Sequence, residues 1–127
     1  MPILLDTGPF ALLTMNSVRI SDALRERIGA QDRVLVSAIS FYEIGQKVRL
    51  GKWADMAPYA AGLEQRARDD GYEVLPLSAE VATNAALMEW EHRDPFDRMI
   101  AAVAMQERVA VVSQDAVFEA IGVERVW

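Results

Sequence analysis

The chain has 127 residues, a length typical of one domain, and 52% of them are hydrophobic, enough to form a buried core. It carries no cysteine, which excludes disulfides, zinc–thiolate sites and cysteine nucleophiles. With 19 acidic and 13 basic residues the net charge is −6, so nucleic acid is not attracted by bulk charge, and a polyanionic partner requires bound cations or a local basic patch.

Short apolar strands alternate with helical segments along the whole chain. In chain order the sequence predicts a strand at 3–5, a turn at 7–9, helices at 10–14 and 21–28, a strand at 34–36, and helices at 37–52 and 58–70. It then predicts a strand at 72–75, helices at 78–91 and 95–107, a strand at 109–112, a short helix at 115–121 and a last strand at 123–126. This alternation indicates an α/β fold in which helices cover both faces of a parallel sheet.

The segment HRDPFDRMIAA, residues 92–102, has the pattern of a helix start. Asp94 is a favoured N-cap, and Pro95 suits the first helical position. Asp97 falls at the third position, where the helix dipole favours a carboxylate. Helix-start chemistry alone therefore accounts for both aspartates, and a role in a functional site needs support from the rest of the chain.

Further carboxylates point to one edge of the predicted sheet, the edge where parallel sheets bind ligands. Asp6 directly follows the first strand, and Asp115 lies just past the fourth. Asp97 heads the helix that leads into the fourth strand, and Glu43 lies about one turn into the helix after the second strand. Local alternatives remain open, because Asp6 and Asp115 are also good helix caps and Glu43 fits a capping box with Ser40.

A cluster of like charges is unfavourable unless protons or a cation neutralise it. Because the chain has no cysteine and one histidine, such a cation would be a hard ion held by oxygen, and Mg²⁺ or Mn²⁺ fits best. Water at such an ion becomes a nucleophile, and a phosphodiester is its natural substrate.

With these residues the chain resembles the PIN-domain family of metal-dependent ribonucleases, specifically the VapC-type toxins of VapBC toxin–antitoxin modules. The resemblance runs nearly end to end and rests on ILLDTGPFALL, VSAISFYEIGQKVRLGK, HRDPFDRMIAAVAMQE and VVSQD. It implies a single PIN domain over residues 1–127, with a three-layer fold and a central parallel sheet of about five strands.

The resemblance implies an acidic pocket whose core positions are Asp6, Glu43, Asp97 and Asp115. In this interpretation Asp6, Asp97 and Asp115 hold one or two Mg²⁺ or Mn²⁺ ions, Asp94 supports them, and Glu43 positions or deprotonates the attacking water. Hydrolysis of an RNA phosphodiester would leave a 5′-phosphate and a 3′-hydroxyl. The resemblance also implies a homodimer and a small antitoxin whose basic tail could enter the pocket.

Several other residues have roles only as hypotheses. Ser113 and Thr7 are expected to support the pocket. Relatives often carry histidine after the Asp-Thr pair, whereas this chain has Gly8, so no side-chain role is expected there. Arg98, Lys47 and Lys52 are candidates for RNA contacts. The alternatives are a solvated helix face, with Glu43–Lys47 as an i, i+4 pair, and for Arg98 a pocket carboxylate as its partner. His92 is expected to be structural, and Trp53 to contact RNA or a partner.

Other functional classes fit less well. A haloacid-dehalogenase-like phosphatase needs a second aspartate two positions after the first, and here that position is Gly8. A response-regulator receiver needs an aspartate after its third strand, which the chain lacks. A non-toxin PIN nuclease and a catalytically silent PIN-like binding module remain alternatives. No apolar run reaches the roughly 18 residues of a membrane helix, and no signal peptide is evident, so we expect a cytoplasmic protein.

Overall fold

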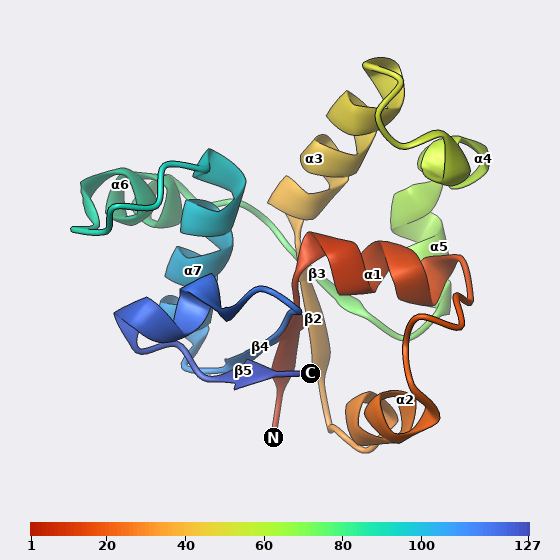
Figure 1. The fold of residues 1–127 in the computed structure, drawn as a ribbon, viewed down its shortest axis with the longest axis horizontal. Coiled ribbons are helices and arrows are strands. Elements are labelled where there is room, and N and C mark those ends of the chain that lie inside the picture. The colour runs from red at the N-terminus through yellow and green to blue at the C-terminus, as the bar shows by residue number, and fades with distance from the viewer.

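A five-stranded parallel sheet lies between two layers of helices in the computed structural model, which describes all residues, 1–127 (Figure 1). The strands stand in the order β3-β2-β1-β4-β5, and every pairing is parallel. Their bounds are β1 Ile3–Leu5, β2 Val34–Ser37, β3 Glu73–Leu75, β4 Ala110–Val112 and β5 Arg125–Val126. This architecture confirms the predicted fold class.

The helices cover both faces of the sheet, because side chains of each strand alternate between two separate cores. On β1, Ile3 and Leu5 pack with the helices at 7–14, 22–29 and 63–69, whereas Leu4 packs with those at 79–87, 95–107 and 116–121. The helical elements are α1 Thr7–Thr14, α2 Asp22–Gly29, α3 Ala38–Arg49, the 3₁₀ helix η1 Ala54–Met56, α4 Ala57–Ala60, α5 Leu63–Asp69, α6 Ala79–Leu87, α7 Pro95–Glu107 and the 3₁₀ helix η2 Ala116–Ile121. None of these helices has the length and apolar character needed to span a membrane.

The strand order creates a crevice at the carboxyl ends of β1 and β4. From β1 the chain moves outward to β2 and β3, and it then returns to the other side of β1 to form β4 and β5. The connections that leave β1 and β4 therefore diverge, which opens the sheet at its usual ligand edge. Asp6 and Ser113 are the first residues after these two strands.

Three predicted elements differ from the structure. Residues 7–9 form the first turn of α1 rather than a separate turn, because Asp6 caps the helix and Pro9 falls where no N–H is needed. The predicted helix 58–70 is interrupted, since Ala61 is extended and Gly62 adopts φ 74°. The helix predicted to reach residue 91 ends at Leu87. The short helix predicted at 115–121 is confirmed, as the 3₁₀ helix η2 capped by Asp115.

Candidate functional site

Asp6 is a half-buried carboxylate at the crevice between β1 and β4. It is the N-cap of α1: its Oδ1 accepts a hydrogen bond from the Thr7 N–H (2.8 Å), and its Oδ2 accepts one from the Ser113 hydroxyl (2.7 Å). Burial raises the pKa of Asp6 to about 6 although these two hydrogen bonds oppose the shift, and the negative charges of Asp97 and Glu43 raise it further. The helix cap and the functional site therefore use the same carboxylate.

Asp97 is held at the same site by the start of α7, which begins as predicted. The Asp94 side chain accepts a hydrogen bond from the Phe96 N–H (2.9 Å), and Pro95 is the first helical residue. One turn of helix thus fixes Asp97, whose Oδ2 lies 2.6 Å from His92 Nε2. Burial raises the pKa of Asp97, the His92 contact lowers it, and the charges of Asp94 and Glu43 raise it.

Glu43 reaches the site from α3 and does not belong to a capping box. The N-cap of α3 is Ser37, whose side chain accepts from the Ile39 N–H (3.2 Å), so the predicted Ser40–Glu43 box is wrong. Glu43 is only 7% exposed, and its Oε2 accepts a hydrogen bond from Lys47 Nζ (2.8 Å). The Ser40 hydroxyl instead bonds the Thr7 hydroxyl (2.8 Å) and joins α3 to α1 beside the pocket.

Asp115 lies at the rim of the site and is linked to Asp6 through one hydroxyl. Its Oδ1 accepts from the Val117 N–H (3.0 Å) and so caps η2, as the local alternative anticipated. Its own N–H donates to Ser113 Oγ (3.0 Å), and that hydroxyl donates to Asp6. The charge of Asp115 is not among those that shift the pKa of Asp6. The electrostatically coupled set is therefore Asp6, Glu43 and Asp97.

The donor set fits a hard divalent cation. Burial, with a smaller contribution from neighbouring carboxylates, raises the pKa of Asp6 and Asp97, so their ionised forms are poorly solvated by the metal-free fold. The most compact group of ligand atoms is not the predicted one, however: His92, Asp94 and Asp97 offer atoms within 4.8 Å of one another. Sequence reasoning missed His92, because its place depends on the path of the loop before α7; the HRDPFD spacing was the only available signal.

Arg98 has a structural role and pairs with no pocket carboxylate, so that alternative is wrong, while its contact with RNA stays a prediction. Its guanidinium donates to five backbone carbonyls at and after the end of α6, those of Ala85 (2.8 Å), Ala86 (3.3 Å), Met88, Trp90 (2.9 Å) and His92 (2.9 Å). Because α6 ends at Leu87, these carbonyls find no N–H donor in a following helical turn. The planar guanidinium of an arginine has enough N–H donors to bond several of them at once. Arg98 thereby fixes the loop that brings His92 to Asp97.

Replacing Arg98 by lysine is expected to destabilise the fold by about 2 kcal/mol, because an ammonium cannot satisfy five carbonyls held in a planar arrangement. Thermal melting should show a fall in Tm of roughly 6–10 °C. Arg93→Lys is the matched control, since Arg93 is exposed and its side chain makes no ion pair. A variant at position 98 that melts like the wild type but binds RNA less tightly would support the RNA-contact interpretation.

The two lysines proposed to contact RNA differ in their surroundings. Lys47 is paired with Glu43, and its Nζ also lies 5.4 Å from the centre of the Trp53 ring. Lys52 is exposed and makes no ion pair. The positive charge of Lys47 therefore compensates the site itself, whereas that of Lys52 is free to meet an anion.

Comparison with known proteins places this arrangement in a family. Residues 3–124 match the family described as PIN domain. Among solved structures, VapBC2 from Rickettsia felis bound to a promoter DNA fragment is 15% identical with a TM-score of 0.71, over 99% of this chain and 98% of that one. VapC20 from Mycobacterium tuberculosis, described as a sarcin-ricin loop cleaving toxin, is 20% identical (TM-score 0.70, 98% of both chains).

DNA-bound VapBC from Salmonella typhimurium is similar to the same degree, with 24% identity and a TM-score of 0.68 over 99% of this chain and 97% of that one. A search of curated protein sequences returns no match. At these identities the solved structures establish a common fold, while the family match spans nearly the whole sequence. The chain therefore belongs to the PIN-domain family, a family of nucleases.

Proposed function

We propose that this protein is a Mg²⁺- or Mn²⁺-dependent endoribonuclease and that it acts as the toxin of a toxin–antitoxin pair. The observation that carries the proposal is the coupling of Asp6, Glu43 and Asp97 at the open edge of a PIN fold. Three carboxylates from three elements, two with a raised pKa, are costly to the metal-free fold. Such an arrangement is typical of a site that binds a cation and, through it, a phosphate.

The toxin role and the RNA substrate are supported by the structural neighbours. VapC20 is described as a toxin that cleaves the sarcin-ricin loop, and other neighbours are toxin–antitoxin complexes. By similarity we propose an RNA substrate, a small antitoxin as the protein partner, and a homodimer. The net charge of −6 favours an antitoxin that presents a basic segment to the acidic pocket.

Each residue of the site has a proposed role. Asp6, Asp97 and Asp115 would hold the ion, directly or through water, and Asp94 would support Asp97. Glu43 positions the attacking water and receives its proton at Oε2, while Lys47 holds that carboxylate in place. When bound, Mg²⁺ or Mn²⁺ neutralises the carboxylates, orients the phosphodiester and acidifies water in the site.

We expect purified protein, freed of any antitoxin, to cut a total-RNA pool into discrete fragments in Mg²⁺ or Mn²⁺ and to leave it intact in EDTA. Gel electrophoresis followed by end-mapping gives the targets and shows whether the products carry a 5′-phosphate and a 3′-hydroxyl. A folded, antitoxin-free protein that cuts no RNA in either metal would refute the enzyme and leave a binding module.

A further inference from the structure

A groove of about 740 Å³ begins at the catalytic edge and runs along α1. Its mouth is formed by Gly8, two residues after Asp6, and by Gln114, which stands between Ser113 and Asp115. A side chain at position 8 would meet no atom within 4 Å, so the glycine leaves the mouth open. Along the groove, Gly8 is followed by Leu12 and Met15, which recur at helical spacing on one face of α1.

The opposite wall carries two aromatic rings. Trp53 and Tyr59, from the segment that contains η1 and α4, line the groove and are both half-buried. Trp53 is tied to the catalytic site as well, because Lys47 Nζ lies 5.4 Å from its ring centre and 2.8 Å from Glu43. The groove thus offers apolar and aromatic surface that is continuous with the carboxylates.

One cation lines this groove, and a second lies next to a lining residue in the chain. Arg19 lines its far end, is exposed and makes no ion pair. Lys52, next to Trp53 in the chain, is also exposed and unpaired. Asp55 is the one carboxylate in the lining. An unpaired arginine in a groove lined by aromatic rings matches a single nucleic-acid strand, whose bases stack and whose phosphates are anionic.

We propose that this groove binds the single-stranded stretch of RNA adjoining the scissile phosphate, with Trp53 as a stacking platform and Arg19 as a phosphate contact. The inference rests on the proposed nuclease function. Continuity is what favours RNA here: one strand passes from the carboxylates through the mouth at Gly8 to the aromatic wall. Stacking tolerates any base, so the groove contributes affinity for unpaired RNA rather than a sequence preference.

A binding experiment in EDTA tests the groove without cleavage. Oligouridylate and oligoadenylate are titrated into the full-length protein while tryptophan fluorescence is recorded. We expect saturable quenching in the wild type and its loss in Trp53→Phe, because Trp90 and Trp127 lie outside the groove. Quenching that persists in Trp53→Phe, or none at any RNA concentration, would overturn the proposal.

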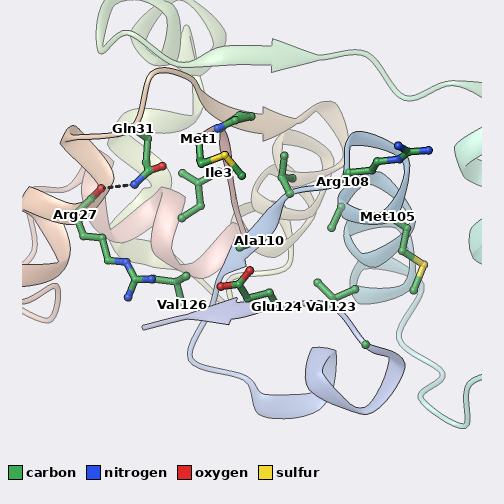
Figure 2. A pocket seen from close by; sticks show the side chains of 14 residues that line it. Met1, Ile3, Arg27, Gln31, Met105, Arg108, Ala110, Val123, Glu124 and Val126 are labelled. Atoms are coloured by element: carbon green, nitrogen blue, oxygen red, sulfur yellow. Dashed lines mark hydrogen bonds between the residues drawn. The ribbon is translucent and has the colours of Figure 1, made fainter.

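Cleavage kinetics supply an independent readout. Arg19→Ala and Trp53→Ala should each raise KM for a single-stranded RNA about tenfold with little change in kcat, and Trp53→Phe should restore most of the loss. Arg27→Ala is the matched control: Arg27 is also exposed and unpaired, but it lines a separate hollow of about 480 Å³ under the amino ends of β1 and β4 (Figure 2).

The two readouts separate failure of the groove from failure of the proposed function. A wild type that cleaves RNA while the Arg19 and Trp53 variants keep its KM refutes the groove and leaves the nuclease standing, and the groove would then suit a polypeptide partner. A wild type that never cleaves but shows Trp53-dependent quenching refutes the enzyme and keeps RNA in the groove. Circular dichroism and thermal melting of each variant identify any loss of activity that comes from unfolding rather than from weaker RNA binding.

Discussion

Asp97→Asn is expected to lower kcat for RNA cleavage about a hundredfold or more and to leave the fold intact. Asparagine keeps the size of the side chain but removes the negative charge that the proposed ion requires. The variant should fold, since Asp97 is not the cap of α7 and its charge is repelled by Asp94 and Glu43. The measurement is single-turnover cleavage in Mn²⁺, beside a melting curve of each protein.

Asp94→Asn is the matched control for this prediction. It removes a carboxylate only three residues away, and asparagine caps a helix as well as aspartate does. Because Asp94 is exposed and supports the site only indirectly, we expect a loss of less than about tenfold. Equal losses in both variants would mean that net charge near α7, rather than a specific ligand, governs cleavage. Full activity in Asp97→Asn would remove Asp97 from the site.

Asp6→Asn and Glu43→Gln should reproduce the loss for different reasons. Asp6 is a proposed ligand, so a higher Mn²⁺ concentration should restore the RNA cleavage activity of Asp6→Asn only weakly. Glu43 is proposed to handle the proton of the attacking water, so Glu43→Gln should bind Mn²⁺ nearly as the wild type does while kcat falls. The comparison separates metal binding from proton transfer.

The parts of the site that follow from local chemistry could be predicted from the sequence. Asp94 and Pro95 start α7 as expected, and this makes Asp97 the third residue of the helix. Parallel strands end at a common edge, so Asp6 and Glu43 could be assigned to the same edge without coordinates. Local caps and sheet topology together account for the coupled carboxylates.

The remaining features depend on contacts that no local pattern encodes. Arg98 stands beside Asp97 in the sequence, which suggested an RNA contact, yet its guanidinium turns to the carbonyls at the end of α6. His92 meets Asp97 only because that loop is held in place. The break before α5 was missed for another reason: Gly62 lies in the left-handed region, and one glycine in a helical pattern does not reveal its φ.

The metal-free protein is expected to become more stable as the pH falls from 7.5 to 5. Asp6 has a pKa of about 6 in the folded chain against an ordinary 3.8, so the folded state binds more protons across this interval. Its ionised form therefore destabilises the fold above pH 6, and protonation removes that cost. A shift of this size corresponds to about 3 kcal/mol in full, and roughly half of it is recovered between pH 7.5 and 5. The raised pKa of Asp97 acts in the same direction.

Urea unfolding in EDTA at pH 5, 6 and 7.5 measures this effect, and Asp6→Asn isolates it. Glu73, whose pKa is lowered by its pairing with Arg33, acts in the opposite sense because it loses stabilisation as the pH falls. That contribution is common to both proteins, so the difference between wild type and Asp6→Asn reports the aspartate alone. We expect Asp6→Asn to be the more stable protein at pH 7.5 and the difference to narrow to roughly half at pH 5, because unfolded Asp6 still ionises there. Parallel profiles would show that Asp6 titrates normally.

A saturating concentration of Mn²⁺ should reverse the pH dependence. The ion binds the ionised carboxylates, so at a hundredfold excess over its dissociation constant it stabilises the fold by about 2.7 kcal/mol at pH 7.5. At pH 5 protons compete for the same oxygens and the gain shrinks. Asp6→Asn should show only a small Mn²⁺ effect at either pH. If the stability of the wild type does not change with Mn²⁺, the carboxylates do not bind this ion. Their mutual repulsion would then have to be neutralised by another cationic partner.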